Sequence, residues 1–162
     1  MGSVIPLKKE INNSYLELKN SLESKLHEVN QRIKYKLASE INLIHKMTDY
    51  HFKSGGKRIR PLLTLGSAQL CGYTNGNRDI NLAACVELIH NATLLHDDVI
   101  DNSDLRRGIK TSNMIWGNQS SILVGDYLLS RCFEMMVEDG SQEVLKLYLQ
   151  LLRKLHKAKY LN

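Results

Sequence analysis

The stretch INLAACVELIHNATLLHDDVID, residues 80–101, is mostly apolar until it reaches Asp97, Asp98 and Asp101. A helix that is apolar almost all round is buried by its neighbours, so this stretch predicts a central helix. Its acidic end is costly, because like charges at helical spacing repel each other and the carboxyl end of a helix disfavours anions. Bound Mg²⁺ would remove the repulsion, since it prefers carboxylate oxygens. The alternative is a solvated helix end with no ligand.

Helical spacing of apolar residues extends over most of the chain, and we therefore predict an all-α fold. The sequence shows no strand pattern of alternating polarity and no internal repeat. The expected helices cover about residues 7–30, 39–52, 60–72, 80–101 and 120–138, and the tail after residue 144 has the pattern of a further helix. Polar connections are expected at 73–79 and 101–113.

The net charge of +5 is concentrated at the end of the chain. Residues 145–162 contain five of the 22 basic residues and no acidic residue, so residues 1–144 carry 17 basic and 17 acidic residues. A neutral body argues against a nucleic-acid partner, because such proteins present a basic face.

Other features of the chain bear on its compartment. We expect no transmembrane segment, because no run of about 18 apolar residues occurs, and we find no signal peptide at the N-terminus. Cys71, Cys85 and Cys132 are widely spaced and odd in number, which is typical of reduced core thiols. These features favour a cytoplasmic protein.

Two basic clusters flank the acidic helix in the sequence. The loop GGKRIRP, residues 55–61, leads into a predicted helix N-terminus, where backbone N–H groups favour anions. Lys57 and Arg60 are three residues apart and can converge on one phosphate group. Arg106 and Arg107 follow the aspartates directly. The alternative for each cluster is a solvated basic turn.

His90 lies seven residues before Asp97, two helical turns back on the same face. A lone histidine there is more often a core residue, but this one lies on the face of the proposed site. His96 points elsewhere, and we assign it no role.

The motifs GGKRIRP, ELIHNATLLHDDVID, DLRRG and VGDYLLSR, in this order between about Ser39 and Glu138, resemble the trans-type polyprenyl diphosphate synthase family. The resemblance is strongest to the long-chain bacterial enzymes that make octaprenyl or decaprenyl diphosphate for quinones. It implies the N-terminal half of an isoprenoid-synthase-type helical bundle. It also implies condensation of isopentenyl diphosphate with an allylic diphosphate, with Mg²⁺ as cofactor.

The resemblance also implies roles for single residues. Lys57, Arg60, His90 and Arg107 match positions that bind isopentenyl diphosphate; Asp97 and Asp101 match metal ligands of the first aspartate-rich motif; Arg106 matches the arginine on the allylic diphosphate. Asp98 belongs to that motif without a clear role as a ligand. The small residues Ala92 and Thr93 stand near the position where a bulky aromatic caps short products in the family, so a long product is expected.

The chain departs from the family pattern after residue 144. Residues 1–144 are the expected family part and residues 145–162 a non-matching basic amphipathic tail, for which a frameshift is one hypothesis. The family's second aspartate-rich motif does not occur in the sequence, so we expect no activity alone. A homo-oligomer or a complementing C-terminal half is the expected partner.

Two other classes of function stay open at this point. One is a non-catalytic diphosphate-binding or regulatory subunit of a full-length synthase. The other is an HD-type metal phosphohydrolase built on His90 and the pair His96-Asp97, for which further ligands are hard to place.

Overall fold

The computed structural model describes residues 7–53 and 56–160, with side chains described for residues 13–53 and 56–154. The helices are α1 (Leu7–Ser21), α2 (Glu23–Lys36), α3 (Asn42–Lys53), α4 (Ile59–Leu70), α5 (Arg78–Ile100), α6 (Ser112–Trp116), α7 (Asn118–Asp139) and α8 (Gln142–Tyr160). Two short antiparallel strands, β1 (Leu105–Arg106) and β2 (Ile109–Lys110), form a hairpin. The prediction of an all-α fold is confirmed, with this hairpin as an addition.

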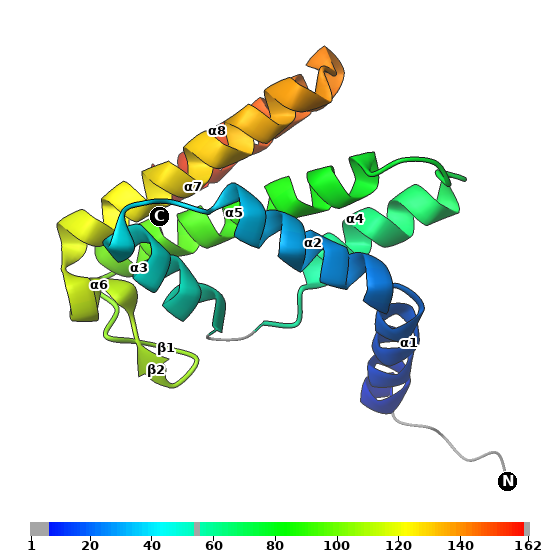
Figure 1. Cartoon of the computed structure of the whole chain (residues 1–162). Coiled ribbons are helices and arrows are strands. Elements are labelled where there is room, and N and C mark those ends of the chain that lie inside the picture. The colour runs from blue at the N-terminus through cyan, green and yellow to red at the C-terminus, as the bar shows by residue number, and fades with distance from the viewer. Residues whose placement is uncertain (1–6, 54–55, 161–162) are drawn as a thin grey trace, which may run out of the picture.

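Helix α5 is the central element, as its apolar sequence predicts. It packs against α7, α4 and α2, and Figure 1 shows it (green) running between them. Ala83, Ala84 and Ala92 are fully buried, and their small side chains let the neighbouring backbones approach closely. Two thiols lie at the contact of α5 with α7, where Cys85 Sγ is 3.8 Å from Cys132 O and Cys132 Sγ is 3.5 Å from Cys85 O. The third cysteine, Cys71, is exposed at the end of α4, so its prediction as a core thiol is wrong.

One predicted helix is two helices in the structure. The expected helix over about 7–30 is interrupted at Leu22, whose backbone (φ −113°, ψ 12°) departs from helical values. The bend lets α2 lie along α5, while α1 points away from the body and touches α4 only in part (Figure 1). Leu22 is itself buried, and the apolar spacing runs through the bend without interruption. Periodicity alone therefore could not locate it.

The connection predicted at 101–113 as a plain polar segment is more ordered than expected. It contains the β1–β2 hairpin and the start of the one-turn helix α6. Strands of two residues are too short to show alternating polarity, which is why the pattern missed them. Tyr50 on α3 supports the hairpin, because its hydroxyl donates to Lys110 O at 2.8 Å.

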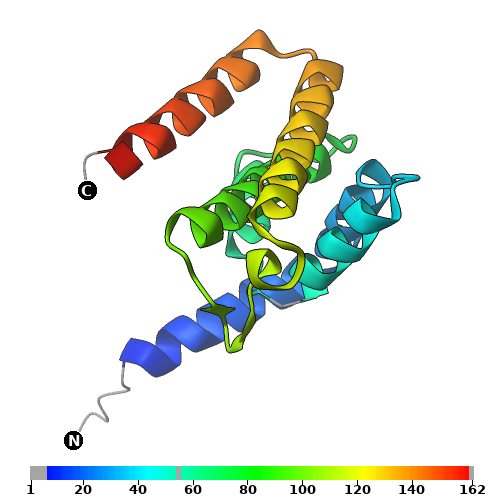
Figure 2. The same cartoon turned by 90° about the vertical axis from the view of Figure 1, so that its left-hand side faces the viewer.

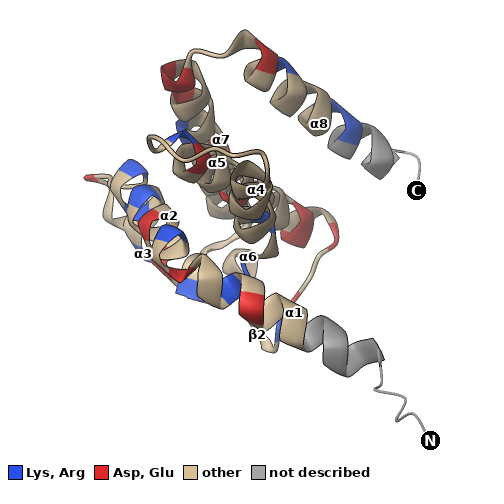
Figure 3. Ribbon diagram, turned by 90° about the vertical axis from the view of Figure 1, so that its right-hand side faces the viewer, with Lys and Arg blue, Asp and Glu red and all other residues tan. Residues whose placement is uncertain are grey.

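Helix α8 packs against the body within the part whose side chains are described, residues 142–154. Leu145, Tyr148 and Leu152 pack against the core, and the Tyr148 hydroxyl donates to Leu82 O at 2.9 Å. Figure 2 shows α8 (orange to red) diverging from α7 toward its end. Figure 3 shows one acidic band near its start and basic bands further along. Leu147 on the opposite face is 63% exposed. Within the described residues, no helix is long and apolar enough to cross a membrane.

His51 is a buried polar residue where α3 meets the hairpin. His51 is 7% exposed, and it lines a small crevice with Asp98 and Arg106. Burial lowers the pKa of His51 to about 4. Asp98 opposes this shift, while Arg106, Arg107 and His90 add to it. The imidazole is therefore neutral at pH 7.

This burial predicts a stability that depends on pH. The folded pKa lies below the unfolded value of 6.5, so protonation favours the unfolded chain, and stability present at pH 7 is lost as pH falls toward 4. The His51 contribution to that loss is about 3 kcal/mol at pH 4. Urea unfolding at pH 7, 6, 5 and 4 should show this decline in the unmodified chain and a smaller one in His51→Gln. His27→Gln, on the exposed face of α2, is the matched control. An equal decline in His51→Gln and the unmodified chain would contradict the assignment.

Candidate functional site

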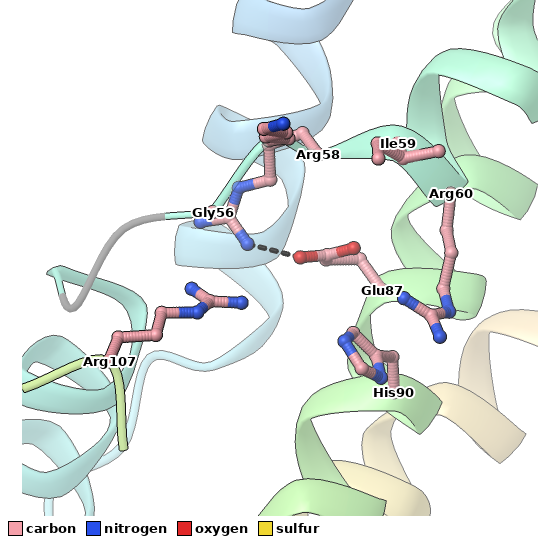
Figure 4. Close-up of a pocket in the computed structure, with 8 residues that line it drawn as sticks. Gly56, Arg58, Ile59, Arg60, Glu87, His90 and Arg107 are labelled. Carbon is pink, nitrogen blue, oxygen red and sulfur yellow. Dashed lines mark hydrogen bonds and ion pairs between the residues drawn. The ribbon is translucent and has the colours of Figure 1, made fainter.

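A cavity of about 510 Å³ opens where the loop before α4, the middle of α5 and the hairpin turn meet. Its lining residues are Gly56, Lys57, Arg58, Ile59, Arg60, Glu87, His90 and Arg107. The four residues assigned by resemblance to the isopentenyl diphosphate site all line it. Figure 4 shows Arg60 and His90 side by side, with Arg107 entering from the opposite side.

The loop before α4 is held in an unusual conformation. Arg58 stands at the N-cap of α4 with φ 50°, in the left-handed region that non-glycine residues rarely adopt. The Tyr15 hydroxyl on α1 donates to Lys57 O at 2.9 Å, and the Arg58 guanidinium lies 5.3 Å from the centre of the Phe52 ring. Ser54 and Gly55, the first residue of the GGKRIRP motif, lie outside the described residues, so the conformation is known from Gly56 onward.

The hairpin turn carries Arg107 to the cavity. Arg107 and Gly108 are the two turn residues, and both have positive φ (53° and 82°), as a two-residue type I′ turn requires. Gly56 leaves room for the arginine, because a Cβ at Gly56 would lie 3.0 Å from Arg107 Nη1. Gly108 in the turn and Gly56 in the loop therefore both allow Arg107 to lie close to the loop before α4.

The cavity is strongly cationic, with one acidic group. Lys57, Arg58, Arg60 and Arg107 contribute positive charge, and Glu87 contributes one negative charge. Burial lowers the pKa of His90, and the nearby Arg60 lowers it further, so this imidazole is neutral at pH 7. Glu87 acts in the opposite direction and raises the pKa of His90, but its effect is smaller than the combined effect of burial and Arg60. Such a cavity suits an anion with several negative oxygens.

The aspartates at the end of α5 divide into two kinds. Asp98 is 1% exposed and accepts bonds from Arg106, with Nη2–Oδ1 at 2.6 Å and Nε–Oδ1 at 2.9 Å. Asp97 is half-buried, and Asp101 is exposed one turn further on, at the C-cap of α5. The structure therefore brings Arg106 to Asp98 and keeps Asp97 and Asp101 on a separate face.

Several half-buried positions form one stripe along α5. Leu82, Val86, His90, Thr93 and Asp97 recur at helical spacing of three or four residues. The Thr93 hydroxyl in this stripe donates to His90 O at 2.7 Å. Ala92 does not belong to the stripe, because it is fully buried in the core. Of the two residues predicted to border the product pocket, Thr93 alone lies on this stripe.

His96 lies away from the cavity, against α7. Its Nε2 is 3.2 Å from Ile122 O and 3.4 Å from Asp126 Oδ1. A Cβ at Gly125 would lie 2.3 Å from the same nitrogen, so the ring occupies the space above a glycine. His90 and His96 therefore face different surroundings, and across the described residues no cluster of three or more metal-ligating side chains is found. This arrangement gives no support to the phosphohydrolase alternative.

Sequence reasoning missed one pair of residues in the cavity. Arg58 Nη1 contacts Glu87 Oε1, and this ion pair joins the loop to α5 (Figure 4). Glu87 lies three residues before His90, so helical spacing could have placed both beside the same cavity. The charge of Glu87 gave the opposite signal, because a carboxylate is unexpected in an anion-binding cavity.

Comparisons with known proteins agree with this geometry. The sequence model of the Polyprenyl synthetase family matches residues 41–162. The octaprenyl diphosphate synthase of Escherichia coli (strain K12) is 48% identical over 118 residues, which are 73% of this chain and 36% of that protein. This chain therefore aligns with little more than a third of that relative's length.

Solved structures show the same similarity. The decaprenyl diphosphate synthase from Rhodobacter capsulatus is 40% identical with a TM-score of 0.87, over 91% of this chain and 45% of that one. The polyprenyl synthase from Caulobacter crescentus CB15, solved with calcium and isoprenyl diphosphate, is 39% identical with a TM-score of 0.87, over 91% and 44%. The helical arrangement is that of these isoprenoid synthases, and the predicted resemblance to their long-chain members is confirmed. This chain belongs to the polyprenyl synthetase family.

Proposed function

We propose that this chain supplies the isopentenyl diphosphate site and the first metal site of a long-chain trans-prenyltransferase. The observation that carries the proposal is the convergence of Lys57, Arg60, His90 and Arg107 on one cavity from three separate segments. The lysine and the two arginines bind the diphosphate oxygens, and His90, neutral at pH 7, offers a hydrogen bond without charge.

The donor groups at the end of α5 fit Mg²⁺. Asp97 and Asp101 offer hard carboxylate oxygens one helical turn apart, which leaves other coordination positions for water and phosphate oxygens. Asp98 is occupied by Arg106 and is left out of the metal site in this proposal. When bound, Mg²⁺ neutralises the allylic diphosphate and makes it a better leaving group.

The protein's own part in the reaction is positioning and exclusion of water. The basic cavity holds isopentenyl diphosphate so that its double bond meets the allylic carbon as the diphosphate departs, and a proton is then lost. Arg106 uses Nε and Nη2 for Asp98, and we assign its Nη1 to the allylic diphosphate. The apolar residues of the α5 stripe, Leu82 and Val86, shelter the growing prenyl chain from water.

Two finer assignments extend the proposal. The small Thr93 on the α5 stripe, with Ala92 beside it in the core, favours a long product such as a quinone side chain. This chain aligns with 36–45% of the length of these relatives, and the proposed reaction also uses residues of the family that align with the remainder. We propose that residues 1–144 are the working part, that residues 145–162 form a basic tail for which a frameshift is one hypothesis, and that the complete cytoplasmic assembly forms with a complementing half or as a homo-oligomer.

A non-catalytic role is the second candidate. The cavity is cationic enough to bind a diphosphate without any chemistry, and the sequence contains one aspartate-rich motif of the two that the family resemblance implies. In this alternative the chain binds a full-length synthase and regulates it.

The first prediction tests the cavity by binding. Arg60→Ala should weaken the binding of isopentenyl diphosphate by at least tenfold, because it removes a charge-assisted contact of about 1.5–3 kcal/mol. The measurement is isothermal titration of the 162-residue chain. Lys53→Ala is the control, because Lys53 is a similarly exposed cation outside the cavity that pairs with Asp49. Equal binding by Arg60→Ala and the unmodified chain would remove the cavity assignment.

The second prediction tests the metal site. Asp97→Ala and Asp101→Ala should each abolish the enhancement by Mg²⁺ of allylic diphosphate binding, because each removes a carboxylate ligand. Asp104→Ala, in the connection just beyond, serves as the matched control and should keep the enhancement. Titrations with and without Mg²⁺ provide the measurement, and an unchanged enhancement in both site variants would refute the ligand assignment.

The third prediction separates the two candidate functions. The chain with Mg²⁺ and both diphosphates should not elongate prenyl chains alone, and should do so when mixed with the second half of the Escherichia coli octaprenyl diphosphate synthase. Radiolabelled isopentenyl diphosphate and chromatography measure the products, and Asp97→Ala is the inactive control. Elongation by the chain alone would overturn the need for a partner. A change in product length of the full-length synthase, without complementation, would favour the regulatory role.

A further inference from the structure

Glu87 is a carboxylate in a cavity that otherwise attracts anions. It is 5% exposed, so its charge is largely removed from water, and it lines the cavity beside His90. A negative charge there opposes the binding of a diphosphate by direct repulsion. Its presence therefore calls for a compensating role.

The contact of Glu87 with Arg58 supplies that role. Glu87 Oε1 meets Arg58 Nη1, and the same guanidinium lies over the Phe52 ring, so the arginine is fixed between α5 and α3. Arg58 has φ 50°, a conformation that costs roughly 1–2 kcal/mol in a non-glycine residue and needs surrounding contacts to persist. The ion pair and the ring contact are such contacts.

The conformation of Arg58 decides how two cavity cations lie relative to each other. Lys57 precedes it in the loop, and Arg60 follows it in the first turn of α4. Relaxation of Arg58 to a negative φ would turn the chain before it away from the helix. Lys57 would then move relative to Arg60, and the two could no longer meet the same diphosphate.

We propose that Glu87 is a positioning residue, which holds Arg58 in its left-handed conformation and so sets Lys57 and Arg60 for one diphosphate group. This inference rests on the proposed function of the cavity. It assigns Arg58 to the support of the loop and leaves Lys57, Arg60 and Arg107 as the cations that contact the ligand.

The positioning role and simple charge repulsion predict opposite changes in the affinity for isopentenyl diphosphate when Glu87 is replaced. Glu87→Gln removes a negative charge from an anion site, so repulsion alone predicts tighter binding of isopentenyl diphosphate. Loss of the positioning contact predicts binding at least tenfold weaker. Isothermal titration of the 162-residue chain distinguishes the two signs, and unchanged or tighter binding by Glu87→Gln overturns the inference.

Asp79→Asn is the matched control for loss of a buried ion pair on the same helix. Asp79 is 4% exposed, and its Oδ2 lies 2.5 Å from Lys25 Nζ, outside the cavity. This variant should lower thermal stability as Glu87→Gln does, yet bind isopentenyl diphosphate like the unmodified chain. Equal weakening in both variants would mean that Glu87 acts through stability alone, and would overturn the positioning role.

A second measurement does not depend on binding. Hydrogen exchange of the peptide covering residues 56–62 should be faster in Glu87→Gln than in the unmodified chain and Asp79→Asn. Unchanged exchange there overturns the inference by itself. If the unmodified chain binds no diphosphate, the proposed function fails, and the exchange experiment still decides whether Glu87 holds the loop.

Discussion

The burial of most of α5 among its neighbours is the constraint on which the remaining structure depends. A helix so apolar must be enclosed by α2, α4 and α7, and that enclosure leaves a half-buried stripe in the direction of the cavity. His90, Thr93 and Asp97 lie along that direction. The same packing that stabilises the fold therefore aligns the polar groups of the site, and neither can be altered without the other.

Close carboxylates at the end of a buried helix need different partners if all are to remain charged. Asp98 finds Arg106 on the hairpin and is almost fully removed from water. This bond also fastens the hairpin to α5, which fixes where Arg107 enters the cavity. Asp98 thus has a structural partner on the hairpin, and Asp97 and Asp101 lie on a separate face of the helix end.

The sequence could predict the long helices, because the three- and four-residue spacing of their apolar residues can be read without knowledge of their neighbours. It could not predict the bend at Leu22, since a buried leucine continues the spacing on both sides of the bend. The hairpin was missed for another reason, because two-residue strands depend on the positive φ of Arg107 and Gly108 rather than on a pattern. For the candidate site, the motifs indicated Lys57, Arg60, His90 and Arg107, and all four line one cavity in the structure. The pair Arg58–Glu87 was missed because ion pairs between distant segments depend on the fold that brings them together.

The position of His96 above Gly125 restricts how α5 and α7 can move along each other. The ring of His96 fits over α7 where the backbone carries no side chain, and one turn to either side the positions are Ser121 and Leu129. A slide of α7 by one turn along α5 would drive the ring into one of these Cβ atoms. The contact of His96 with Gly125 thus fixes the axial register of α5 and α7. It also fixes the position of the acidic end of α5 relative to the start of α7.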